Sequence, residues 1–171
     1  ISITTNTSNL LCFGNTNGSA TVTSTGGTPA YSYLWSNGRT TVNNTGLAAG
    51  IYIVTVTDAN ACQNFNSVTI TQPNTALAST PSQVNNSCNG NTNGAASVSV
   101  SGGSAPYSYL WSNGRTTASN SGLPAGSYSV TISDANSCTL SNNFTITQPN
   151  AIIITSTSSN PLCNGSSNGT I

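Results

Sequence analysis

The chain has 171 residues and is 2 % charged, with two Lys or Arg, two Asp or Glu, no His and zero net charge. Ordinary domains are about 25 % charged. A neutral surface does not attract nucleic acid or anionic lipid, and no apolar run approaches the roughly 18 residues of a membrane span. General acid–base and nucleophilic catalysis need a titrating base. We therefore expect no enzyme, cofactor, nucleic-acid partner or membrane insertion.

Alternation of apolar and polar residues with a period of two dominates the chain, and no segment has helical spacing. Asn37-Gly38 is a strong signal for a two-residue hairpin turn. Asp58-Ala59-Asn60 predicts a second tight turn. In chain order we expect a leading strand at 1–5 and then strands at 18–25, 31–35, 39–43, 52–58 and 62–71.

The landmarks of the first half recur 76 positions later, which predicts a tandem repeat. The recurring residues are Cys12 and Cys88, Trp35 and Trp111, Arg39 and Arg115, Asp58 and Asp134, and Cys62 and Cys138. The segment 1–12 matches 152–163, which predicts the start of a third unit. We divide the chain into 1–11 (end of a preceding repeat or linker strand), 12–75 (repeat 1), 76–87 (linker or leading strand), 88–150 (repeat 2) and 151–171 (linker and start of a truncated repeat 3).

Short strands separated by turns every eight to twelve residues are typical of a β-sandwich. We predict an all-β chain of tandem immunoglobulin-like (PKD-like) sandwich repeats of about 76 residues. Tyr52, Val54 and Val56 have apolar counterparts in the second half, so this set is expected to face the core. Trp35 and Trp111 are expected to be structural core residues rather than sugar-stacking platforms.

The blocks Cys12-Phe13-Gly14, Gly26 to Gly38, Leu47 to Tyr52 and Val54 to Cys62 resemble the SprB repeat of Bacteroidota gliding-motility adhesins. The second half carries the same blocks between Cys88 and Cys138. The resemblance implies a large secreted cell-surface protein of many repeats, exported by the type IX route. Leu34 and Leu110 depart from the family pattern, in which this position is often small or polar. They are expected to face outward as a candidate contact patch.

A disulfide is expected because a unit of about 76 residues buries only roughly 60 % of its unfolded surface. The first and last strands of an immunoglobulin-like sandwich run parallel, so their starts lie at the same end. This argument favours Cys12–Cys62 and Cys88–Cys138, with the partner of Cys163 beyond the chain. The alternative joins neighbouring repeats through Cys62–Cys88 and Cys138–Cys163. Without His or a C-x-x-C spacing, zinc is not expected.

Each repeat holds one Asp and one Arg at matching places. We expect Asp58 and Asp134 to close Asx-type turns, with an ion pair to Arg39 and Arg115 as a further structural element. The alternative is a calcium site formed by Asp58 and Asn60, and by Asp134 and Asn136. Calcium requires six to eight oxygens and normally several carboxylates, so one carboxylate per repeat makes this a weak candidate.

These observations favour a structural repeat of a secreted, extracellular adhesin, acting as a stalk or fibre at the cell surface and contacting neighbouring repeats of its own chain. One alternative is a self-assembling filament or sheath with homotypic contacts, suggested by the zero net charge and by Leu34 and Leu110. Another is a glycan-binding module that takes a surface polysaccharide.

Overall fold

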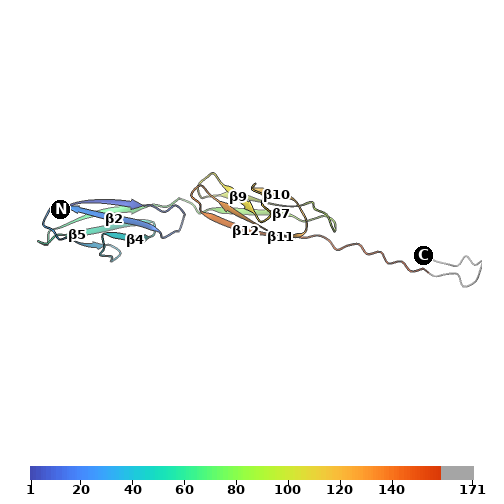
Figure 1. The fold of residues 1–171 in the computed structure, drawn as a ribbon, viewed down its shortest axis with the longest axis horizontal. Coiled ribbons are helices and arrows are strands. Elements are labelled where there is room, and N and C mark those ends of the chain that lie inside the picture. Colours follow the sequence, from blue (N-terminus) through green and yellow to red (C-terminus); the bar gives the residue numbers. More distant parts are fainter. Residues whose placement is uncertain (159–171) are drawn as a thin grey trace, which may run out of the picture.

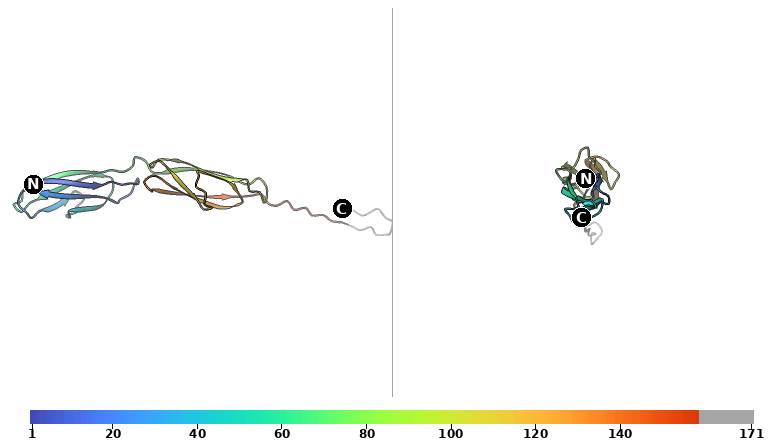
Figure 2. Two further views of the ribbon diagram at one scale, coloured as in Figure 1. Left: turned by 45° about the horizontal axis from the view of Figure 1, so that its top comes forward. Right: turned by 90° about the vertical axis from the view of Figure 1, so that its left-hand side faces the viewer.

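A computed structural model describes residues 1–158 as two β-sandwiches placed end to end (Figure 1). The view along the long axis shows the second sandwich almost directly behind the first, so the two form one slender rod (Figure 2). The expected third repeat and Cys163 lie outside the described residues. Within 1–158 every regular element is a strand, and no helix suited to crossing a membrane is found there.

The first sandwich consists of two antiparallel three-stranded sheets, ordered β1-β2-β4 and β3-β5-β6. Its strands are β1 (Ser2–Ser8), β2 (Gly18–Thr25), β3 (Ser32–Trp35), β4 (Asn43–Leu47), β5 (Gly50–Thr57) and β6 (Gln63–Ile70).

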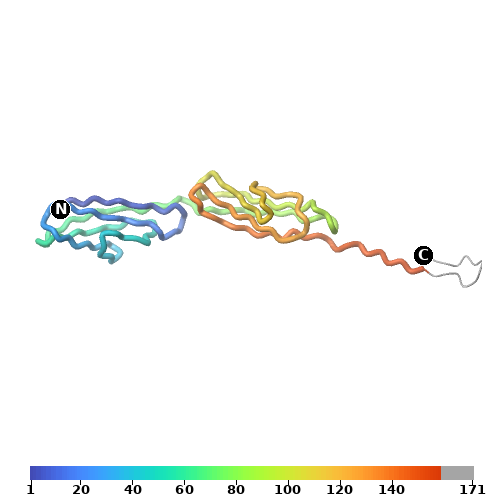
Figure 3. Tube along the Cα trace, viewed as in Figure 1, coloured from blue at the N-terminus to red at the C-terminus, as the bar shows by residue number. Residues whose placement is uncertain are grey.

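The second sandwich repeats this arrangement with sheets ordered β7-β8-β10 and β9-β11-β12. Its strands are β7 (Ala78–Val84), β8 (Gly94–Ser101), β9 (Ser108–Trp111), β10 (Ser119–Leu123), β11 (Gly126–Ser133) and β12 (Thr139–Ile146). The tube view shows the segment after β12 leading away from the rod at the far end (Figure 3). The all-β prediction and the sandwich class are confirmed.

Each sandwich has its own apolar core, formed by alternate residues of facing strands. Val54 and Val56 are fully buried, as the comparison of the two halves predicts. Trp35 is 1 % exposed and donates its indole N–H to the Thr41 carbonyl at 2.9 Å. Trp111 is equally buried and donates to Thr117 at 2.8 Å. The tryptophans are therefore core residues, as predicted.

The predicted boundaries between repeats are corrected by the pairing of the leading segments. β1 pairs along its whole length with β2, and β7 pairs in the same way with β8. Segment 1–11 thus begins the first sandwich instead of ending an earlier repeat. Segment 76–87 provides the leading strand of the second sandwich, which is one of the two roles predicted for it. The connection between the sandwiches therefore consists only of the few residues between β6 and β7.

The predicted hairpin at Asn37-Gly38 is wrong. A tight turn does form there, since Gly38 N–H donates to the Trp35 carbonyl at 2.8 Å. The chain then crosses to the opposite sheet, where β4 pairs with β2 while β3 pairs with β5. The fully buried Asn44 exchanges two side-chain hydrogen bonds of 3.1 Å with the exposed Asn37, and this pair ties the turn to the start of β4.

Candidate functional site

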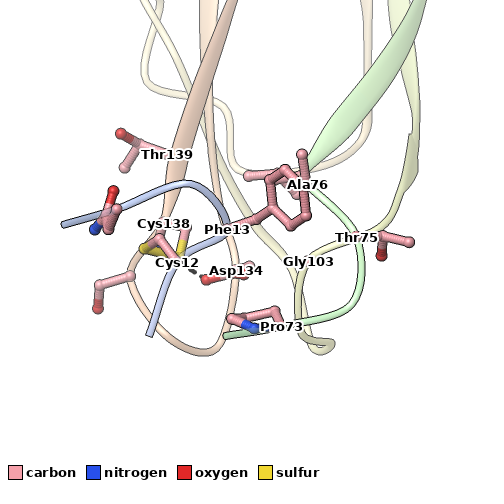
Figure 4. A pocket seen from close by; sticks show the side chains of 12 residues that line it. Cys12, Phe13, Pro73, Thr75, Ala76, Gly103, Asp134, Cys138 and Thr139 are labelled. Carbon is pink, nitrogen blue, oxygen red and sulfur yellow. Dashed lines mark hydrogen bonds between the residues drawn. A yellow bond between two sulfur atoms is a disulfide. The ribbon is translucent and has the colours of Figure 1, made fainter. Parts of the chain in front are cut away.

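The joint between the two sandwiches contains a disulfide bond between Cys12 and Cys138 (Figure 4). Their Cα atoms are 5.7 Å apart, although the residues are 126 positions apart in the sequence. Cys62 and Cys88 are free and exposed in the described part of the chain. The predicted pairs Cys12–Cys62 and Cys88–Cys138 are therefore wrong, and so is the alternative Cys62–Cys88 pair.

Cys12 and Cys62 cannot pair because β1 is the first strand of the sandwich. β1 runs parallel to β6, because Asn64 Nδ2 donates to the Ile1 carbonyl at one end and Leu10 N–H to the Thr71 carbonyl at the other. Cys12 follows the end of β1, whereas Cys62 precedes the start of β6. The two cysteines are thus separated by a strand length of roughly 25 Å, at about 3.3 Å per residue. A disulfide needs Cα atoms within about 7 Å.

We call the end of a sandwich where its first strand starts the N-terminal pole, and the opposite end the C-terminal pole. The first repeat therefore presents Cys12 at its C-terminal pole, and the second repeat presents Cys138 at its N-terminal pole. These two poles meet in the joint, as the single rod of Figure 1 shows.

At the N-terminal pole of the second repeat, the buried carboxylate of Asp134 organises the turn that carries Cys138. It accepts backbone N–H groups from Ser104, Asn136 and Cys138 at 2.9–3.0 Å. Burial raises the pKa of Asp134, but these N–H groups outweigh that effect and lower it below its usual range. The turn is thus fixed by an ionised carboxylate, which confirms the Asx-type prediction.

At the C-terminal pole of the first repeat, Gln72 organises the turn that carries Cys12. Its Oε1 accepts the Gly14 N–H at 2.9 Å, and the Asn15 N–H donates to the Cys12 carbonyl at 3.4 Å. Next to Cys12, the Leu11 carbonyl accepts a hydrogen bond from Asn136 Nδ2 of the second repeat at 3.0 Å. The disulfide is therefore accompanied by a polar contact between two preorganised turns.

The peptide connection passes beside the disulfide and packs closely against the second sandwich. Gly103 N–H donates to the Thr75 carbonyl at 3.2 Å. A Cβ on Gly102, which has a φ of 68°, would lie 2.0 Å from the Ala76 carbonyl oxygen, so only glycine fits. Between the connection and the disulfide lies a hollow of about 390 Å³ into which Phe13 projects (Figure 4). Two covalent links, peptide and disulfide, thus cross one small interface.

The family model described as "SprB repeat" matches the chain twice, at residues 4–40 and 80–116. Each sandwich thus contains one match to the SprB repeat. Both matches start inside the first strand of a sandwich and end just after the turn at Asn37-Gly38 or its counterpart. The matched segments therefore include the cysteine of each C-terminal pole and leave out Cys62 and Cys138.

Two solved structures resemble the SprB repeats only weakly. The crystal structure of murine CEACAM1b is 12 % identical and has a TM-score of 0.30, covering 79 % of this chain and 94 % of that chain. The crystal structure of the S-layer protein SbsC domains 4 and 5 is 14 % identical and has a TM-score of 0.33, covering 85 % and 98 %. None of the curated proteins compared with the chain is a match.

The expected ion pairs do not form, because the partners lie far apart. Asp58 follows β5 next to the start of β3, whereas Arg39 follows the end of β3 and is exposed. The same separation holds for Asp134 and Arg115 in the second SprB repeat. Within residues 1–158 no ion pair involves these four side chains.

The weak calcium candidates do not fit the chemistry of the poles. The Asp58 carboxylate accepts N–H groups from Thr28, Asn60 and Cys62 at 2.9–3.0 Å, as Asp134 does from its own counterparts. Asn60 points its Nδ2 at the Thr28 hydroxyl. These donors present positive charge to the space where a cation would sit, and calcium needs six or more oxygen ligands. Asp58 and Asp134, with Asn60 and Asn136, hold turns.

The outer face of the β3–β5–β6 sheet carries the candidate contact patch. Leu34 is 55 % exposed and Leu110, its counterpart, 59 % exposed, so both leucines face outward as predicted. In the first repeat Leu34 shares this face with three further exposed apolar side chains, Ile51, Ile53 and Phe65. Sugar stacking on Trp35 is ruled out by its burial.

Proposed function

We propose that these SprB repeats form a load-bearing stalk segment of a cell-surface adhesin. The observation that carries the proposal is the Cys12–Cys138 bond, which ties one repeat to the next instead of closing a single sandwich. Repeats of this family are associated with cell-surface proteins. Disulfides form and persist in such oxidising surroundings. A stalk needs repeats that keep their direction, and two covalent links across one joint restrict bending more than one link does.

The position of the bond also determines which residues carry tension. A pull on the N-terminus passes along β1 to Cys12, crosses the disulfide to Cys138, and leaves along β12. Both strands run along the rod. The covalent path therefore avoids residues 13–137, which make up most of both sandwiches. Force cannot draw those residues out while the disulfide is intact.

Single-molecule stretching between the two termini tests this role. The oxidised chain is expected to extend without unfolding steps from the bypassed region. Reduction should add ~430 Å of contour length for the sequence separation of 126, at about 3.4 Å per residue. An oxidised chain that releases this length before the bond breaks would contradict the proposal.

A matched pair of variants supplies the control. Cys12→Ser should behave like the reduced chain even under oxidising conditions, because it lacks the cross-link. Cys88→Ser removes a cysteine that makes no bond in the described structure and should behave like the unaltered oxidised chain.

Lateral association is a second candidate role, supported by the four exposed apolar side chains on the outer face of the first repeat. Near-zero net charge favours association because it removes repulsion between molecules. The partner would be a second copy of this chain, and sedimentation of the purified protein tests for it.

A further inference from the structure

The two free cysteines lie at the outer poles of the rod. Cys62 is at the N-terminal pole of the first repeat and Cys88 at the C-terminal pole of the second. They are the counterparts of Cys138 and Cys12, the two residues that are bonded in the joint. Each outer pole therefore presents one half of a joint of the kind that the rod contains at its middle.

The half at Cys88 already has the conformation of the bonded half at Cys12. Gln148 Oε1 accepts the Gly90 N–H at 2.9 Å, as Gln72 does for Gly14. The Asn91 N–H donates to the Cys88 carbonyl at 3.3 Å, matching the bond at Cys12. A hollow of about 360 Å³ lies beside Cys88, in the place where the joint has its own hollow.

The half at Cys62 likewise has the conformation of the bonded half at Cys138. Asp58 accepts the same three backbone N–H groups as Asp134, including that of the cysteine itself at 2.9 Å. Ala61 and Ser137, just before each cysteine, have φ angles of 62° and 64°. Asn136 donates both to a hydroxyl of its own repeat and to the Leu11 carbonyl across the joint. At Asn60 only the hydroxyl contact is made.

We propose that Cys88 and Cys62 are complementary half-joints, each of which forms a disulfide with the opposite pole of another SprB repeat. The occupant at Cys88 is a repeat that presents an Asp-Ala-Asn-x-Cys turn, and the first repeat of a second copy of this chain carries one at Asp58–Cys62. In the new joint the Ser87 carbonyl takes the place of Leu11 and accepts from Asn60. The hydrogen-bonded turns prepare both halves, so little ordering accompanies bond formation.

The bond forms by oxidation of two thiols. The Cys62 and Cys88 sulfurs lose two electrons and two protons to an external disulfide, such as oxidised glutathione or a disulfide oxidoreductase, which is reduced to two thiols. A thiolate of one pole first forms a mixed disulfide with this oxidant, and the thiolate of the other pole then displaces the leaving thiol.

Where repeats linked in this way also follow one another in one chain, as the two described repeats do, two covalent paths cross each joint. One path follows the first strand of a repeat to its C-terminal-pole cysteine and continues along the last strand of the next. The other path follows the last strand and then the peptide connection. This inference extends the proposed stalk role, but its test concerns the choice of bonding partner and not resistance to force.

Oxidation of a mixture of two variants, each of which keeps only one of the two free thiols, tests the proposal. On a Cys163→Ser background with the Cys12–Cys138 bond intact, Cys62→Ser leaves only the Cys88 thiol, and Cys88→Ser leaves only the Cys62 thiol. An equimolar mixture, one chain tagged for mass, is oxidised with a glutathione redox pair. We expect the Cys88–Cys62 heterodimer to exceed each symmetric dimer at least tenfold, whereas random pairing gives only twofold.

Two outcomes would overturn the proposal: symmetric dimers in the random proportion, or no disulfide-linked dimer at millimolar protein. A matched variant tests whether the heterodimer excess depends on the folded turn. Asp58→Ala in the Cys62-bearing chain removes the carboxylate that holds the turn and should reduce the heterodimer excess to the random value, while the Cys62 thiol remains present. The mechanical experiment on Cys12–Cys138 is independent of both outcomes, so the stalk role and this pairing can fail separately.

Discussion

At their poles the two SprB repeats share the hydrogen bonds that hold the cysteine-bearing turns, whereas on their outer faces they differ in chemistry. Asp58 and Asp134 accept N–H groups from corresponding residues at nearly equal distances, and Gln72 and Gln148 hold corresponding turns. On the outer face, Phe65 of the first repeat is replaced by Ser141 in the second. The shared parts are the hydrogen-bonded turns that carry the cysteines.

The contrast between poles and outer faces indicates which residues of each repeat have to keep one geometry. A joint requires two poles that fit any neighbour of the same kind, so the polar turns must keep one geometry. The outer face contacts nothing within the described rod, and its side chains can change from Ile51 and Ile53 to Ser127 and Ser129 without disturbing either sandwich.

The largest expected effect comes from removing a core tryptophan. Trp35→Ala and Trp111→Ala should each lower the free energy of unfolding of their own sandwich by about 3–5 kcal/mol. Trp111 also packs against Phe144, with ring centroids 5.3 Å apart, where the first repeat has Val68, so its loss should cost about 1 kcal/mol more. Denaturation with fluorescence from the remaining tryptophan shows whether the other repeat is unaffected; a loss shared equally by both repeats would contradict independent cores.

Breaking the joint should affect both repeats. Cys138→Ser removes a cross-link and should lower the stability of each sandwich by about 2–4 kcal/mol, since either one can then unfold without the tether. Chemical denaturation under non-reducing conditions measures this change. Cys62→Ser is the control and should leave both transitions unchanged; an equal loss in both variants would sink the assignment of the bond.

Acid should weaken both repeats through their aspartates. N–H donation, chiefly from Thr28, lowers the pKa of Asp58 below the ordinary 3.8, and the pKa of Asp134 is also lowered. Each carboxylate therefore contributes stability that is complete above about pH 4 and is lost as the pH falls through the lowered folded-state value. Thermal unfolding between pH 2 and 6 should show this slope, and Asp58→Asn together with Asp134→Asn should abolish most of it.

The smallest effect on stability is expected on the outer face. Phe65→Ser, which copies Ser141 of the second repeat, should change the free energy of unfolding by less than about 0.5 kcal/mol. If the face mediates lateral association, this variant and Leu34→Ser should sediment as smaller species than the unaltered chain. Leu110→Ser, on the face with fewer apolar neighbours, provides the comparison.

Period-two alternation was sufficient to predict the class of fold, most of the strands and the buried tryptophans, because burial on one face of a strand leaves a direct mark on sequence. The strand expected at 39–43 lies instead at Asn43–Leu47. The same signal could not show which sheet each strand joins. The segment at Asn37-Gly38 has the composition of a hairpin, and only the strand pairing reveals that the chain crosses to the other sheet.

The disulfide was missed for a related reason. The argument from parallel first and last strands is sound, but the pair Cys12–Cys62 requires Cys12 to precede the first strand of the sandwich, and Cys12 follows β1. The prediction therefore placed Cys12 at the wrong pole. The signal that could have prevented the error is the segment 152–163, whose match to 1–12 marks those residues as the opening of a repeat.

The disulfide of the joint also determines which fragments stay connected after proteolysis. The chain has two trypsin-type cleavage sites, after Arg39 and Arg115, and both arginines are exposed. Both also lie between Cys12 and Cys138, so cuts there leave the N-terminal and C-terminal pieces joined by the disulfide. A cleaved chain should therefore keep its two termini in one covalent molecule on a non-reducing gel and separate only after reduction. The rod therefore stays in one covalent piece after cleavage at either arginine.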